Sequence, residues 1–235
     1  MPVATLTAVD GGSVKIDSPL DFSMIGATTF LVARIAQHLQ EFGAGELAFG
    51  DHVAQATEVS FEEEYSVQGG RLRLGSAEHT DQAGGLSPRS FRLGVWSGKA
   101  YCVKTFIYNR PTSELIDIFR LFSIDERDDG VVLNSTRGDV PVMMKGAQVP
   151  KVVNNIQGLG LLEIRRLTPE IKRQFPPWDG LPVRGGGIFH DDPRGQGEGS
   201  LVLLGLSAVT RVYRDPALLD EEFVDAASEL LVTWS

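Results

Sequence analysis

The sequence has few of the residues that build chemically reactive sites. It contains one cysteine, Cys102, and four histidines in 235 residues. A single thiol cannot form an internal disulfide bond or a cysteine-based zinc site, so the chain is compatible with a reducing compartment. Cys102 lies among apolar residues of an expected strand, where a thiol behaves as an inert, small hydrophobic side chain. The small number of thiols and imidazoles argues against a metalloenzyme.

Long apolar runs and targeting signals are also missing. The run LVLLGL at 201–206 is among the longest, and it is far shorter than the ~18 residues of a membrane-spanning helix. The opening residues, MPVATLTAVDGG, lack the basic region and apolar core of a signal peptide. We therefore expect a cytoplasmic protein without a membrane span.

Basic charge is scarce overall and unevenly distributed. The 22 basic and 31 acidic residues give a net charge of −9, which disfavours general nucleic-acid binding. Residues 145–194 nevertheless hold eight basic and five acidic residues, whereas the segments on either side are acidic. This basic segment predicts either a solvated surface or a patch that docks an acidic face of another subunit, including a second copy of the chain.

Glycine is the residue that the chain has in excess, with 26 copies, and this predicts many turns. The hydrophobic content of 42% is ordinary for a globular protein. A chain of this length forms one large domain or two small ones. We expect a single domain over 1–235, because the segment that follows residue 199 is too short to fold alone.

Hairpin signals dominate the pattern, and no internal repeat is visible. Turns at Asp10-Gly11, Gly69-Gly70 and Ser97-Gly98 separate runs that alternate between apolar and polar residues. We therefore predict an α+β fold with a mainly antiparallel sheet built from hairpins and with about three helices. Further strands are predicted at 131–134, 140–144, 161–167 and 201–213.

The three predicted helices differ in how clearly they begin. The first covers about residues 22–42 and the second covers 112–122, both with apolar residues at helical spacing. The third begins at Pro216, with Asp215 as its N-cap. The tail at 230–235 fits either an extension of this helix or a strand.

Residues 176–199 combine stiff prolines with flexible glycines and carry aromatic, aliphatic and arginine side chains. Such side chains anchor protein interfaces, and a long loop without secondary structure is usually functional or disordered. We interpret the segment as a Gly/Pro-rich arm or long loop that binds a partner, packs on its own domain or is disordered. The candidate partner-binding residues are Trp178, Arg184, Ile188, Phe189 and Arg194 in the arm, and Arg165, Arg166 and Arg173 in the basic segment before it.

Signatures of catalysis and cofactor binding are incomplete. Gly98-Lys99 matches part of a phosphate-binding loop, but the hydroxyl residue after the lysine and the first-glycine spacing are missing. Arg137-Gly138-Asp139 matches an adhesion tripeptide, and a turn explains it more simply. His190 and Asp192 are metal candidates that share one face of an extended chain, although a third ligand must come from elsewhere. We assign no catalytic residue and no cofactor.

Two classes of function fit these features. The first is a non-enzymatic structural or interaction protein, a subunit of a larger homo- or hetero-oligomeric assembly that docks through the arm and the basic segment. The second is an enzyme or a binder of small molecules or metals, with a pocket roofed by residues 176–199. The missing catalytic signature favours the first class.

Overall fold

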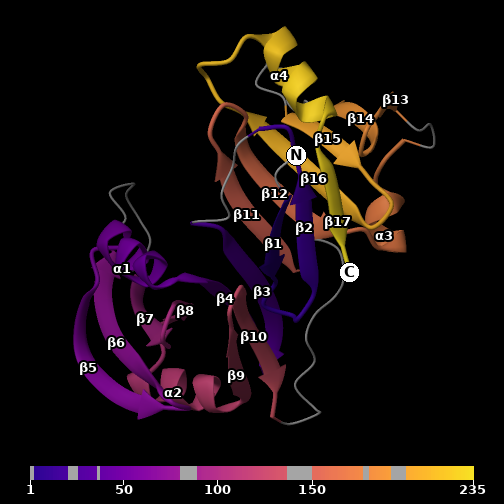
Figure 1. The fold of residues 1–235 in the computed structure, drawn as a ribbon. Helices are drawn as coiled ribbons and strands as arrows, with labels where there is room; N and C mark the ends of the chain where they lie inside the picture. Colours follow the sequence, from indigo (N-terminus) through magenta and orange to yellow (C-terminus); the bar gives the residue numbers. More distant parts are fainter. Residues whose placement is uncertain are drawn as a thin grey trace. The chain divides into compact units, whose positions relative to one another are not determined.

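The computed structural model describes residues 3–20, 26–35, 38–79, 89–136, 150–176, 180–191 and 200–235, apart from the side chains of residues 78, 79, 89 and 90. The chain folds into two compact units (Figure 1). Unit 1 contains Met1–Ala8, Gly12–Thr29 and Met144–Ser235, and unit 2 contains Val9–Gly11 and Phe30–Met143. The single domain over 1–235 stays a prediction. Within unit 1, residues 14–17 near the N-terminus pair with residues 231–234 near the C-terminus.

Unit 2 is built around six strands of the larger sheet, which follow one another in the order β3-β4-β8-β7-β6-β5. The inner face of this sheet packs against helix α2 (Thr112–Arg120) and the hairpin of β9 (Phe122–Arg127) and β10 (Gly130–Ser135). Its outer face packs against helix α1 (Leu47–Ala56). The sheet strands are β3 (Thr28–Ile35), β4 (His38–Glu46), β5 (Ser60–Val67), β6 (Gly70–His79), β7 (Arg89–Ser97) and β8 (Tyr101–Tyr108).

Unit 1 also contains six strands of the larger sheet, in the order β13-β14-β15-β16-β12-β11, and three strands of the smaller sheet, in the order β17-β2-β1. One core joins these two sheets and helix α4 (Asp220–Ser228), and a smaller cluster on the outer face includes helix α3 (Pro169–Lys172). The strands are β1 (Val3–Thr7), β2 (Ser13–Asp17), β11 (Lys151–Ile156), β12 (Gly160–Arg166), β13 (Leu181–Val183), β14 (Gly186–Asp191), β15 (Ser200–Leu204), β16 (Ala208–Arg214) and β17 (Leu231–Trp234).

The two units repeat the same plan. In unit 2 the chain runs β4-α1-β5-β6-β7-β8-α2-β9, and in unit 1 it runs β12-α3-β13-β14-β15-β16-α4-β17. The six strands of each unit follow corresponding orders. The pairs β4–β8 and β7–β8 of unit 2 are antiparallel, as are their counterparts β12–β16 and β15–β16 in unit 1. The structure therefore contains an internal topological repeat that the sequence does not reveal.

Most of the predicted hairpins are confirmed. β1 pairs with β2 across Asp10-Gly11, β5 with β6 across Gly69, and β7 with β8 across Gly98. The predicted class is also confirmed in its coarse form, since the chain is mainly antiparallel sheet with helices, four of them within the described residues. The tail forms a strand, β17. None of the described helices has the length and apolarity that crossing a membrane requires.

The helix predicted over 22–42 is wrong, because β3 and β4 occupy its described part. Leu31 and Phe42 are both buried, but they lie in different strands, while Leu39 is 52% exposed. The apolar residues thus match helical spacing by coincidence, and the true period is two.

Two predicted elements near the C-terminus are also wrong in extent. The strand over 201–213 is a hairpin, in which Gly205 donates its N–H to the carbonyl of Ala208 between β15 and β16. The last helix begins at Asp220, because the side chain of Asp215 accepts the N–H of Ala217 in a turn before the helix.

The expected arm without secondary structure is wrong for residues 181–183 and 186–191, which form β13 and β14. Gly186 has a φ of +139°, and a Cβ atom there would lie 2.2 Å from the carbonyl oxygen of Leu204. Only glycine fits this close approach. Residues 177–179 and 192–199 lie outside the described residues, as do the predicted strand at 140–144 and the tripeptide 137–139.

Candidate functional sites

A small pocket opens on the outer face of the unit 1 sheet, beside α3. The helix has one turn, begins with Pro169 and is capped by Thr168, whose side-chain oxygen accepts the N–H of Ile171 at 3.3 Å. Such a short helix covers little of the sheet, and a volume of about 100 Å³ remains beside it. We call this space the α3 pocket; its lining includes Glu163, Arg165, Ile171, Phe175, Val209 and Arg211.

Paired charges surround the apolar floor of the α3 pocket. Glu163 forms ion pairs with Arg165 at 2.6 Å and with Lys151 at 3.6 Å, while Arg211 contacts Asp191 at 2.6 Å. The Nε atom of Arg211 is buried and has no hydrogen-bond partner in the described part of the chain. The Arg211 side chain as a whole is 38% exposed, so the guanidinium can contact an acceptor from solvent through its other N–H groups.

The pKa of Arg211 reflects competing effects. Partial burial alone would lower it, but interactions with Tyr213 and Asp191 raise the pKa of this guanidinium above its ordinary value. The side chain therefore remains a cation at any physiological pH, and it can hold an anion that enters the α3 pocket.

The predicted partner-binding residues do not gather in one place. Ile188 is buried in the main core of unit 1 and Phe189 in the cluster beneath α3, where its ring lies 6.1 Å from that of Phe175. Arg184 is used within the unit, since it contacts Asp17 at 2.7 Å. Trp178 and Arg194 lie outside the described residues.

The three arginines of the preceding basic segment differ in exposure. Arg165 lines the α3 pocket, and Arg166 lies over the ring of Trp234 at 5.8 Å. The side chain of Arg173 is 74% exposed and contacts Glu170 at 3.4 Å. Arg165 and Arg173 thus remain accessible near α3, next to the exposed Lys172.

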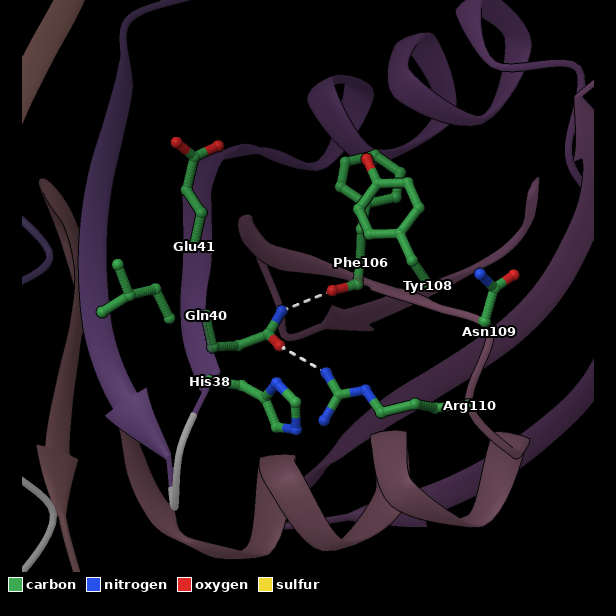
Figure 2. A pocket seen from close by; sticks show the side chains of 8 residues that line it. His38, Gln40, Glu41, Phe106, Tyr108, Asn109 and Arg110 are labelled. Carbon is green, nitrogen blue, oxygen red and sulfur yellow. Dashed lines mark hydrogen bonds between the residues drawn. The ribbon is translucent and has the colours of Figure 1, made fainter. Parts of the chain in front are cut away.

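A second, larger pocket lies in unit 2, between β4 and β8. These strands pair from Phe42 opposite Thr105 to Glu46 opposite Tyr101, although β4 begins at His38 and β8 continues to Tyr108. Beyond Phe42 the two strands no longer pair with each other, and a volume of about 660 Å³ opens beside their ends. We call this space the wedge pocket; its lining includes His38, Gln40, Phe106, Tyr108, Asn109 and Arg110 (Figure 2).

Gln40 bridges the two strands where their backbone pairing stops. It is 3% exposed, and its side-chain amide donates hydrogen bonds to the carbonyl of Phe106 and to Oγ1 of Thr105. Its side-chain oxygen accepts a hydrogen bond from Nη2 of Arg110 at 3.1 Å (Figure 2). Nη1 of Arg110 contacts Glu114 at 3.0 Å. Gln40 therefore holds the strands at a fixed separation and fixes the guanidinium at the rim of the pocket.

Sequence reasoning missed the wedge pocket because it depends on where two strands stop pairing. The sequence carries little signal, because Gln40 stands between Leu39 and Glu41 and does not interrupt an apolar run. Burial of an amide side chain requires partners, and three come from residues more than 60 positions away. No local pattern reports such contacts.

Reactive and metal-binding groups give no further site within the described residues. Cys102 is fully buried, and burial raises the pKa of its thiol to about 11, so it is unreactive in the folded protein. The described part of the chain brings together no group of three or more metal-ligating side chains. His190 is exposed on β14, Asp191 contacts Arg211, and Asp192 lies outside the described residues.

Comparison with known proteins adds no relative, since no family model, no curated protein and no solved structure matches the chain.

Proposed function

We propose that the protein is a non-enzymatic structural subunit of a homo- or hetero-oligomeric assembly, and that it docks a neighbouring subunit through the surface around α3. The observation that carries this proposal is the α3 pocket, in which the partly exposed guanidiniums of Arg165 and Arg211 stand beside an apolar floor. A carboxylate side chain from a neighbour would contact these guanidiniums, while an attached methylene chain would contact the floor.

Charge supports the choice of a protein partner. The chain carries a net charge of −9, so a second copy or a similar acidic subunit presents many carboxylates. The α3 surface carries five cations, Lys151, Arg165, Lys172, Arg173 and Arg211. Three carboxylates, Glu163, Glu170 and Asp191, pair with four of them, so the surface keeps an excess of positive charge. Opposed surface charges raise association rates and fix the orientation of a neighbour.

The acidic strand β5 is the complementary feature that unit 2 contributes. Glu58, Glu62, Glu63 and Glu64 are exposed along or just before this strand, which forms one edge of the unit 2 sheet. Charged residues on an edge strand prevent uncontrolled pairing of sheets. We propose that they also select a basic surface, so that copies of the chain associate head to tail.

The test compares two charge-reversed variants of the full chain. Lys172→Glu with Arg173→Glu alters the α3 surface, and Arg120→Glu with Arg127→Glu makes the same charge change on exposed residues of unit 2. We expect the first variant to weaken association at least about 10-fold and the control to leave it nearly unchanged. Light scattering and analytical ultracentrifugation, alone and in native extract, measure the mass. A 25.5 kDa monomer in both settings, or equal behaviour of the two variants, would contradict the proposal.

A further inference from the structure

The wedge pocket has the properties of a preformed site for a small molecule. Its volume of about 660 Å³ falls within the range of ligand pockets, about 300–1,000 Å³. The hydrogen bonds of Gln40 to Thr105, Phe106 and Arg110 fix the distance between the two walls of the pocket without a ligand. A site that needs no rearrangement loses little binding free energy to ordering.

The pocket has an aromatic side. Phe106 is half-buried, and Tyr108 is 59% exposed, an unusual exposure for a large ring. Tyr108 is supported by Phe91, whose ring centroid lies 6.2 Å away. Figure 2 shows the rings of Phe106 and Tyr108 together on one side of Gln40. A planar apolar group of a ligand would gain contact area on these rings.

The opposite side carries a fixed guanidinium. Arg110 uses one donor on Gln40 and one on Glu114, which leaves three of its five N–H groups for a ligand. The ring of His38 lies beside Arg110 (Figure 2). Guanidinium groups that neighbours hold in place bind planar carboxylates in a two-pronged geometry.

Charges around the pocket disfavour a highly charged ligand. Lys104 contacts Glu41 at 3.6 Å and Arg110 contacts Glu114 at 3.0 Å, so the two cations and two carboxylates balance. A highly charged phosphate would meet Glu41 and Glu114 without enough compensating cations. A carboxylate requires one fixed donor group, which Arg110 provides.

We propose that the wedge pocket binds a small aromatic carboxylate, with the carboxylate on Arg110 and the ring against Phe106 and Tyr108. This site is independent of the α3 surface and of assembly. The proposal concerns binding alone, without a chemical step.

Benzoate is the probe for this proposal, and benzamide is its uncharged match. We expect benzoate to cause saturable shifts in the backbone amide signals of Tyr108 and Arg110 of the full chain, with a dissociation constant of about 1–10 mM. Benzamide should bind at least about 10-fold more weakly, because it cannot form the charged contact. This comparison needs no variant, so it does not depend on the folding of a mutant.

Three variants locate the site. Arg110→Gln and Tyr108→Ala should each weaken benzoate binding about 10-fold or more, while Arg127→Gln, a matched change on the exposed surface of β9, should leave it unchanged. Folding of each variant is checked by its amide spectrum, and Arg110→Lys replaces Arg110→Gln if the latter does not fold.

Three outcomes would overturn the proposal. The first is the lack of a saturable shift at about 50 mM benzoate, which is well above the weakest dissociation constant that we expect. The second is equal binding of benzamide and benzoate. The third is an effect of Arg127→Gln as large as that of Arg110→Gln.

Discussion

The two units follow the same strand order, yet they differ in their pockets. Unit 1 has the α3 pocket where unit 2 has a packed helix, and unit 2 has the wedge pocket where the strands of unit 1 remain paired. Their equivalent positions can be counted from the strand pair that precedes the first helix of each unit. Glu46 opposite Tyr101 in unit 2 corresponds to Arg166 opposite Ala208 in unit 1. The preceding positions then pair Gly45 with Cys102 and Arg165 with Val209. With the strands aligned in this way, differences between equivalent positions explain both pockets.

The outer faces differ because of two glycines. Gly43 and Gly45 of β4 occupy the places that Glu163 and Arg165 of β12 occupy in unit 1. A Cβ atom on Gly45 would lie 3.1 Å from Cβ of Phe49, so the missing side chain lets α1 lie directly on the sheet. In unit 1 two long charged side chains stand there beside a one-turn helix. Because Glu163 and Arg165 stand where unit 2 has glycines, the one-turn helix α3 does not cover the sheet there, and the α3 pocket stays open.

The inner ends of the same strands differ in pairing. β12 and β16 remain paired as far as Gly160 opposite Arg214, whereas β4 and β8 separate beyond Phe42. A side-chain amide, that of Gln40, replaces the missing backbone pairs in unit 2. The same topology thus yields a closed sheet in one unit and the wedge pocket in the other.

The largest expected effect tests whether the two sheets have equivalent cores. Phe42 and Leu162 are equivalent positions on the inner faces and are 1% and 0% exposed. We expect Phe42→Ala to lower the free energy of unfolding by about 4 kcal/mol and Leu162→Ala by about 3 kcal/mol, because each leaves a cavity. Urea denaturation measures both. A loss below about 1 kcal/mol in either variant would show that the equivalence is incorrect.

A smaller loss of stability is expected when valine is placed on the outer faces, and it should differ between the two units. Gly45→Val should lower the free energy of unfolding by about 2 kcal/mol, because the added methyl groups meet the Phe49 ring. Arg165→Val places the same side chain at the equivalent site of unit 1, where a pocket lies, and should cost less than about 1 kcal/mol. Thermal melts at low protein concentration provide the comparison. Equal losses in both variants would mean that glycine has no special role in unit 2.

The smallest effect appears only at high pH. Cys102 and Val209 are equivalent, so Cys102→Val makes the two units alike at this position and should change stability at pH 7 by about 1 kcal/mol or less. The folded thiol has a pKa of about 11, against 9.0 for the ordinary group, so only the unfolded chain releases its proton between these values. Wild-type stability should therefore fall from pH 9 to 11 more steeply than that of the variant.

Urea titrations of both proteins at intervals of about one pH unit across this range measure the difference, since lysines and tyrosines titrate equally in the two. Parallel curves would indicate that the Cys102 thiol ionises in the folded state. Treatment with an alkylating reagent at neutral pH should leave the folded wild type unmodified.

The hairpins could be predicted because their signals are local. Turn residues such as Gly69-Gly70 and Ser97-Gly98 stand between alternating runs, and both hairpins form there. The strands β3 and β4 resemble a helix in the sequence because Leu31, Ile35, Leu39 and Phe42 recur at helical spacing. Only burial against the rest of unit 2 shows that Leu31 and Phe42 belong to two separate strands. β13 and β14 escape prediction because their short apolar runs lie among prolines and glycines, which are typical of loops.

The candidate sites could be predicted less well than the fold. Arg165 and Arg173 were expected to be functional and are accessible near α3, whereas Ile188 and Phe189 serve the internal cores. Gln40 and Arg110 were not expected. Their importance depends on a hydrogen bond between residues 70 positions apart.

The sequence alone determined the coarse fold class, a mainly antiparallel sheet with helices, and the places where the chain reverses direction. Periodicity and turn chemistry act over a few residues and can therefore be recognised locally. The sequence also determined the absence of a cysteine framework and the basic segment in an acidic chain. Tertiary structure decided which elements are repeated, where the α3 pocket and the wedge pocket open, and which arginines remain accessible. These features depend on strand register and on contacts between distant residues, which local patterns do not encode.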